Sequence, residues 1–252
     1  MSPIDELVPL LKKLRLSGLL DSLELRINQA VDEKLSYPEF LFRLVQDEVE
    51  RRDSNQLATR LRKASFEHKK TIEDFDFNFN ASIPKHKVVD LATCSFVQRR
   101  RNALLLGDTG TGKSHIAQAI GHRACVMGLD VLFISAQKLF SSLRAARADN
   151  SYDRLMAKYQ KPSLMIVDDV GLHNLRNDEP LDLYEIIRCR YEHSSLLITS
   201  NRAADEWHSL FGDALMASAA MDRLLHDATV LSFEGQSFRN PTRKKKVRKR
   251  AN

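Results

Sequence analysis

The stretch Asn102–Ser114, NALLLGDTGTGKS, decides the fold of this 252-residue chain. A short apolar run leads into a glycine-rich loop, and a helical pattern follows the loop. Gly107–Ser114 matches the pattern G-x-x-x-x-G-K-[ST] in full. In such a loop the glycines let backbone N–H groups surround a phosphate, and the dipole of the next helix points at the same phosphate. The sequence therefore predicts a strand, a phosphate-binding loop and a helix.

The loop predicts a site for ATP and Mg²⁺. We expect Lys113 to reach the β and γ phosphates and the hydroxyl of Ser114 to bind Mg²⁺. The residues expected to contact the nucleotide are Gly107, Asp108, Thr109, Gly110, Thr111, Gly112, Lys113 and Ser114.

From Arg101 onward, short apolar runs alternate with helical patterns. This alternation is typical of an α/β fold with a parallel, doubly wound sheet. We predict five strands, at residues 102–106, 131–134, 164–167, 196–200 and 229–233.

Two adjacent acids follow the third predicted strand, in Leu164–Asp169, LMIVDD. A carboxylate at the carboxyl end of a buried parallel strand lies at the same edge of the sheet as the phosphate loop. We expect Asp168 to hold Mg²⁺, directly or through water, and Asp169 to act as the base that polarises the attacking water.

Asn201 and Arg223 complete the predicted catalytic set of Lys113, Asp168, Asp169, Asn201 and Arg223. Asn201 follows the fourth strand, where a polar side chain would sense the γ-phosphate. The alternative is that Asn201 caps the next helix. Arg223 could be an arginine finger that reaches the ATP of a neighbouring subunit, or a surface arginine paired with Asp222 or Asp227.

The first 70 residues read as helices. Ser36–Glu39 is a capping box that opens a long helix, and its apolar stripe predicts packing in a small bundle. Residues 51–70 are rich in Lys and Arg, which indicates either a solvated helix face or a surface that follows nucleic-acid phosphates.

The segment Thr71–Phe79, TIEDFDFNF, alternates Phe with polar residues. We expect a short strand or an extended connector here, and Ile83–Pro84 indicates a linker into the next domain. We therefore divide the chain into an N-terminal helical domain for DNA binding or oligomerisation (1–70), a Phe-rich linker (71–98), an ATPase domain (99–234) and a basic C-terminal tail (235–252).

The basic tail carries much of the positive charge. Residues 239–252 hold eight Lys or Arg and no acid. The whole chain has a net charge of +6, so the rest carries −2. Such a tail has little to bury, and its charge suits counterion release on DNA or RNA, although it could also serve solubility alone.

Composition excludes several other classes. The hydrophobic fraction of 43% is typical of a globular protein, and no apolar run is long enough for a membrane span. The polar, acidic start is not a signal peptide. Three widely spaced cysteines predict reduced thiols. We therefore expect a cytoplasmic protein with no membrane partner.

The chain resembles the IstB family, the helper ATPases that insertion sequences encode beside their transposase. It is similar, more distantly, to the DnaC helicase loaders and the DnaA initiators. Besides the phosphate loop, the resemblance rests on residues 14–16, 36–41, 48–52, 71–77, 168–169, 199–201 and 221–224.

The resemblance implies an AAA+ P-loop fold with an N-terminal helical domain. It implies that the Phe-rich linker lies near the adenine, and that Arg223 is the arginine finger of a homo-oligomeric ring or helical filament. The implied partners are double-stranded DNA and the transposase of the same element. The nucleotide state would then control target choice and transposase activation.

Two departures from the AAA+ pattern stand out. Asp169 replaces the more usual Glu, which predicts slow hydrolysis. Little chain follows Phe233 to form a separate lid, so a second sensing arginine would have to be Arg239. Three other functions stay open: a helicase loader, a small-molecule P-loop kinase, and a DNA-binding scaffold that holds ATP without turning it over.

Overall fold

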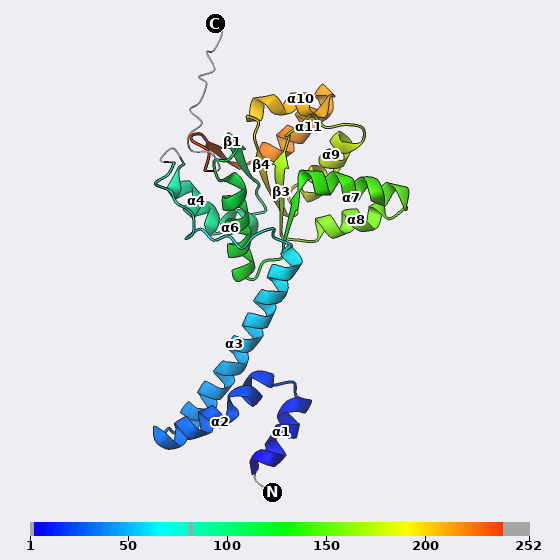
Figure 1. The fold of residues 1–252 in the computed structure, drawn as a ribbon. Coiled ribbons are helices and arrows are strands. Elements are labelled where there is room, and N and C mark those ends of the chain that lie inside the picture. The colour runs from blue at the N-terminus through cyan, green and yellow to red at the C-terminus, as the bar shows by residue number, and fades with distance from the viewer. Residues whose placement is uncertain (1–2, 81–82, 239–252) are drawn as a thin grey trace. The chain divides into compact units, whose positions relative to one another are not determined.

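A five-stranded, all-parallel sheet organises the larger part of the chain (Figure 1). The computed structural model describes residues 3–80 and 83–238. The strand order is β2-β3-β4-β1-β5. The strands are β1 (Ala103–Gly107), β2 (Val131–Ser135), β3 (Leu164–Val170), β4 (Ser195–Ser200) and β5 (Thr229–Phe233). All five predicted strands are confirmed.

The sheet is covered on both faces, which explains why its strands are apolar along their length. Alternate residues such as Leu104, Met165 and Ile198 belong to one large core with the helices α7 to α11. On the other face α6 packs against the strands and α4 packs against α6. The helices of this part are α4 (Lys85–Ala92), α5 (Ser95–Gln98), α6 (Lys113–Val126), α7 (Ala136–Ala148), α8 (Tyr152–Gln160), α9 (Glu179–Arg190), η1 (Ala204–Trp207), α10 (His208–Phe211) and α11 (Ala214–Leu225).

The strand order brings three strand ends together. β4 lies between β1 and β3. The phosphate loop after β1, the residues after β4 and the acids of β3 therefore follow one another along the carboxyl edge of the sheet. This edge is where open parallel sheets bind ligands.

The N-terminal part contains α1 (Pro3–Lys13), α2 (Ser17–Asp32) and α3 (Tyr37–Ala64). The chain divides into two compact units between Thr59 and Arg60, within α3 and before the predicted boundary at residue 70. Helix α3 begins at the predicted capping box: the Ser36 N–H donates to Glu39 Oε2 (2.9 Å), and the Glu39 N–H donates to Ser36 Oγ (3.4 Å).

Gly18 lets α2 approach α3 closely. A Cβ at Gly18 would lie only 2.7 Å from the Cα of Glu48. The buried Glu48 carboxylate accepts the N–H groups of Gly18 (2.6 Å) and Leu19 (3.3 Å), and it thereby caps the first turn of α2. Burial acts to raise the pKa of Glu48, but hydrogen bonds from Arg52, Gly18 and Leu19 outweigh it and lower the pKa.

The apolar stripe of α3 is only partly buried. Leu44 packs in a small core with Leu11, Leu19 and Leu23. Leu41 and Val49 remain about half exposed, at 57% and 51%. The expected bundle therefore covers one side of this stripe.

The linker contains more helix than its sequence suggested. Residues 71–79 form turns, not a strand, and α4 begins directly after Pro84. The Phe side chains gather into a cluster, with ring centroids of Phe75 and Phe77 4.8 Å apart.

Two further sequence predictions concern the cysteines and membrane-spanning helices. Cys94, Cys125 and Cys189 are free thiols, as expected. Across residues 3–80 and 83–238, no helix is long and apolar enough to cross a membrane. The basic residues 239–252, including Arg239, lie outside the described residues.

Candidate nucleotide and magnesium site

The phosphate loop joins β1 to α6 through three glycines with positive φ. These are Gly107 (133°), Gly110 (81°) and Gly112 (98°), conformations that residues with a Cβ rarely adopt. Gly112 directly precedes α6, so the loop N–H groups and the positive end of the helix dipole lie together. This is the backbone that an anion-binding loop requires.

Lys113 is buried and directed back over the loop. Its Nζ donates to the carbonyl oxygens of Gly107 (2.9 Å) and Asp108 (2.7 Å). Thr111 closes the loop by donating to the Asp108 carbonyl (2.8 Å). The ammonium group of Lys113 is thus held inside the loop, where the oxygens of a bound phosphate could accept its hydrogen bonds in place of the two carbonyls.

A cleft of about 690 Å³ opens beside this loop. Its volume is within the usual range for small-molecule sites. Predicted site residues that line it are Thr109, Gly110, Gly112, Lys113, Ser114, Asp168, Asp169 and Asn201. The other three predicted residues, Gly107, Asp108 and Thr111, do not line the cleft but make hydrogen bonds within the loop. The cleft therefore brings together loop, acid and amide groups from three neighbouring strands.

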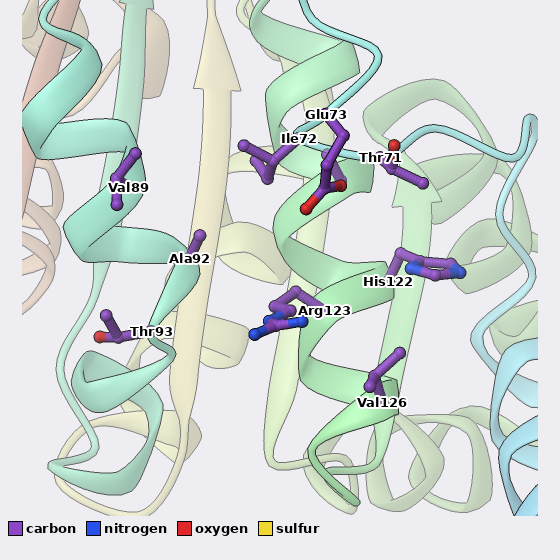
Figure 2. Close-up of a pocket in the computed structure, with 10 residues that line it drawn as sticks. Thr71, Ile72, Glu73, Val89, Ala92, Thr93, His122, Arg123 and Val126 are labelled. Atoms are coloured by element: carbon purple, nitrogen blue, oxygen red, sulfur yellow. The ribbon is translucent and has the colours of Figure 1, made fainter.

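A second groove, between α4 and α6, contains neither the phosphate loop nor the acids of β3 (Figure 2). It measures about 370 Å³, and its lining includes Val89, Ala92 and Val126. No residue of the phosphate loop borders it. The cleft beside Lys113 is therefore the better nucleotide site.

Asp168 and Asp169 occupy a bulge at the end of β3. Val167 pairs with Ile198, but Val170 pairs with Ser200, so β3 has one extra residue opposite Thr199. Asp169 takes up the irregularity with a φ of 58°. The bulge re-aims the side chains, and both acids line the cleft.

The hydroxyl of Thr199 ties the two acids to β4. Thr199 Oγ1 accepts the N–H of Asp169 (2.9 Å) and donates to Oδ1 of Asp168 (2.5 Å). Burial raises the pKa of Asp168, and the nearby charge of Asp169 adds to the rise, while hydrogen bonds from Thr199 and Ser114 oppose it.

Ser114 and Asp168 suit Mg²⁺. Both offer oxygen ligands, which Mg²⁺ prefers, and Mg²⁺ is commonly held by one or two protein oxygens together with water and substrate phosphates. Within the described ranges, no group of three or more His, Cys, Asp or Glu could hold a metal. The two oxygens of Ser114 and Asp168 fit an ion whose other ligands come from water and a nucleotide.

Asn201 follows β4 and borders the same cleft. The capping alternative is wrong, because Ala203 occupies the N-cap of η1. The next residue, Arg202, fixes the turn: it donates to the Gly171 carbonyl (2.7 Å) and to Asn174 Oδ1 (2.8 Å). Asn201 thus lies in a turn that Arg202 ties to the loop after β3.

Arg223 is the one predicted catalytic residue that lies away from this cleft. It belongs to α11, donates to the Ala219 carbonyl (2.8 Å) and stacks over Tyr184. Its own carbonyl accepts from Asn102, which precedes β1, so Arg223 is at the amino edge of the sheet. Asp227 pairs with Arg101 (3.1 Å), and no ion pair joins Arg223 to Asp222 or Asp227 in the described part of the chain.

The outer side of the phosphate loop is covered by a feature that the sequence did not indicate. We call residues Gly235–Phe238 the strap. The Phe238 N–H donates to the Gly110 carbonyl (2.8 Å), and a Cβ at Gly110 would overlap Ser237 Oγ.

The strap is held to the Phe-rich linker by Asn80. This side chain donates to the Gln236 carbonyl (3.1 Å) and accepts the Gln236 N–H (3.3 Å). Phe238 packs against Phe79 with ring centroids 4.1 Å apart, and Phe75 lies against Gly112. No short-range sequence pattern joins residues so far apart along the chain.

A parallel sheet with a phosphate loop after β1, paired acids on β3 and a polar residue after β4 defines an AAA+ P-loop protein. The chain belongs to the family of IstB-like ATP binding proteins, whose profile matches residues 9–246.

Relatives from insertion sequences match over most of their length. One from Pseudomonas aeruginosa, named for ATP binding and for insertion sequence IS21, is 35% identical over 240 residues, covering 95% of this chain and 91% of that protein. One from Mycobacterium tuberculosis, also named for ATP binding in an insertion sequence, is 37% identical and covers 91% and 92%.

Solved structures show the same fold. DnaA from Aquifex aeolicus bound to AMPPCP has a TM-score of 0.56 and 19% identity, over 68% of this chain and 51% of that one. The crystal structure of DnaI has a TM-score of 0.56 and 20% identity, over 67% and 90%. At these identities the likeness concerns the fold alone.

Proposed function

We propose that this protein is an ATP-hydrolysing helper of transposition, which assembles on double-stranded DNA and activates a transposase encoded by the same element. The family and its insertion-sequence relatives support this setting. The observation that carries the proposal is the division of the catalytic set. Lys113, Asp168, Asp169 and Asn201 meet at one cleft, whereas Arg223 lies at the opposite edge of the sheet.

The residues of the cleft divide the work of phosphoryl transfer to water. Loop N–H groups and Lys113 bind the β and γ phosphates, with Lys113 exchanging its loop carbonyls for phosphate oxygens. Asp169 accepts a proton from the attacking water, and Asn201 orients that water against the γ-phosphate. Ser114 and Asp168 would hold Mg²⁺, which would neutralise charge on the phosphates when bound.

Arg223 would act in a neighbouring subunit. Because it lies away from the cleft of its own chain, it can stabilise transition-state charge only at another chain's ATP. ATP would then sit between subunits of a ring or helical filament, and hydrolysis would release or hand on the DNA.

Duplex DNA would bind through exposed basic residues. Arg51 and Arg52 are already used in ion pairs with Asp21 and Glu48. Arg62, Lys63 and Lys69 are exposed, and residues 239–252 add eight more basic side chains. Phosphate contacts of this kind predict strong salt dependence.

The test measures ATP hydrolysis with and without duplex DNA over a range of protein concentrations. The proposal predicts a rate per subunit that rises cooperatively with concentration and with DNA, and a loss of at least 10³-fold in Arg223→Ala, in line with other arginine fingers. Rates that ignore both DNA and concentration would contradict it. Capture of the transposase, tested against a replicative helicase, then separates this function from helicase loading.

One observation favours a second candidate, a DNA-binding scaffold with little ATP turnover. Asp169 has a short side chain on a left-handed backbone, and its N–H is fixed by Thr199. DNA assembly that requires ATP but continues unchanged without measurable hydrolysis would support the scaffold.

A further inference from the structure

Thr199 is a buried polar residue near the carboxyl end of β4, a central strand of the sheet. The whole of β4 is buried, and the two residues before Thr199, Leu197 and Ile198, are apolar. A buried hydroxyl must find hydrogen-bond partners, and valine would fill the same space without that need. The reason for threonine at this position therefore lies in the partners of its hydroxyl.

Those partners are the two acids of the bulge. The hydroxyl proton goes to Asp168 Oδ1, and the oxygen accepts the Asp169 N–H. Both bonds use one atom, so the direction of the Asp168 carboxylate and the left-handed backbone of Asp169 are set together. With Oδ1 engaged by Thr199, rotation of the carboxylate about its last bond is restricted.

Among the hydrogen bonds of the described residues, Ser200, the last residue of β4, makes no equivalent contact with the acids. Ser200 Oγ accepts the Arg202 N–H (3.1 Å), and Arg202 reaches the loop after Gly171. Among the hydrogen bonds described here, Thr199 is thus the side chain of β4 that contacts both Asp168 and Asp169.

We propose that Thr199 is a positioning residue that orients the Asp168 carboxylate for Mg²⁺ and fixes Asp169 for water activation. This inference rests on the proposed role of Asp168 at the ion. Hydrogen bonds to the ligands of a metal commonly change its affinity by about 10–100-fold. Thr199 therefore controls how strongly Mg²⁺ promotes nucleotide binding, without touching the nucleotide.

The experiment compares wild type with Thr199→Val and Thr199→Ser. A fluorescent ATP analogue is titrated at a series of Mg²⁺ concentrations and in EDTA. In Thr199→Val the Mg²⁺ concentration for half-maximal enhancement of binding should rise by about 10-fold or more. The affinity in EDTA should stay within about twofold, and Thr199→Ser should restore the Mg²⁺ dependence.

Two results would overturn the inference. One is a wild-type Mg²⁺ dependence in Thr199→Val. The other is an equal defect in Thr199→Val and Thr199→Ser, which would assign the effect to packing. Asp168→Asn is the reference: if it also leaves the Mg²⁺ dependence unchanged, the proposed function fails at this site, whereas an effect of Asp168→Asn alone removes only the role of Thr199.

Discussion

Arg223 and Lys113 lie at opposite ends of strand β1. Lys113 begins the helix after the loop that leaves the carboxyl end of β1, and Arg223 is bonded to Asn102 just before its amino end. A single chain therefore does not bring both to one ATP. Under the proposed function, ATP hydrolysis would therefore require a neighbouring subunit to supply Arg223.

Lys113→Ala should weaken ATP binding and abolish ATP-driven assembly. The ammonium group supplies charge-assisted hydrogen bonds, which contribute about 2 kcal/mol or more, or roughly a 30-fold change in affinity. Isothermal titration calorimetry with ATP and Mg²⁺ measures the loss, and sedimentation measures assembly. Lys161→Ala, which changes an exposed lysine at the end of α8, is the matched control. Normal assembly of Lys113→Ala would contradict the proposed function.

Asp168→Asn should stabilise the protein without nucleotide while removing its response to Mg²⁺. Burial raises the pKa of Asp168 in the folded state, so ionisation costs folding free energy at any pH above its unfolded value, and acidification relieves that cost. At neutral pH the amide should raise Tm by about 2–4 °C for each kcal/mol recovered. Asp130→Asn, on the surface, should leave Tm unchanged. A lower Tm for Asp168→Asn would show that the charge is compensated.

Gly110→Ala should displace the strap and reduce nucleotide affinity. The new Cβ would overlap Ser237 Oγ and force a left-handed alanine. Gly212→Ala is a matched control, because Gly212 also has a positive φ (69°) but nothing within 4 Å of a Cβ. Both variants should lose about 1 kcal/mol of stability from backbone strain, whereas only Gly110→Ala should weaken ATP binding.

Adding Ser237→Gly to Gly110→Ala separates overlap from strain. Removal of the opposing side chain should recover part of the ATP affinity. No recovery in the double variant would mean that strain within the loop, and not the strap, sets the affinity.

Gly18→Ala should destabilise the N-terminal helices by about 1–3 kcal/mol, because the new methyl group would press on the backbone of α3 at Glu48. Asn28→Ala, at an exposed position of α2, is the control and should be neutral or slightly stabilising. Urea denaturation followed by circular dichroism compares them. Equal stability of the two variants would show that the helices can separate without cost.

The ion pair between Asp47 and Arg26 should make the stability of the N-terminal helices depend on pH. The Arg26 guanidinium, 2.6 Å away, lowers the pKa of Asp47 from 3.8 to about 2. The ion pair therefore stabilises the fold at pH above about 4, and its contribution is lost as the pH falls toward 2. Because the pair is partly solvated, we expect Asp47→Asn to cost about 1 kcal/mol at pH 7 and much less at pH 2. An equal cost at pH 7 and pH 2 would point to packing.

The sequence was most informative where local rules govern the structure. The five strands, the capping box at Ser36 and the loop before α6 follow from apolar periodicity, capping chemistry and a phosphate-loop pattern. Each of these signals lies within a few neighbouring residues, so it can be read from a single sequence without knowledge of tertiary contacts.

Features made by residues far apart in the chain were not foreseen. The pairing of Asn80 with Gln236 and the link from Thr199 to Asp168 depend on tertiary contacts. The bulge at Asp169 has no glycine to mark it. Helices α4 and α5 are short, and the packing of α4 on α6 outweighs the linker-like composition around Pro84.

The most direct test of the shared site mixes two inactive variants. Asp169→Asn has a defective cleft but keeps its Arg223, while Arg223→Ala has an intact cleft but no finger. The account predicts that each alone is inactive with DNA and that a mixture regains ATP hydrolysis, because an Asp169→Asn subunit supplies Arg223 to the cleft of an Arg223→Ala neighbour. A mixture no more active than the sum of its two components would contradict a site built between subunits.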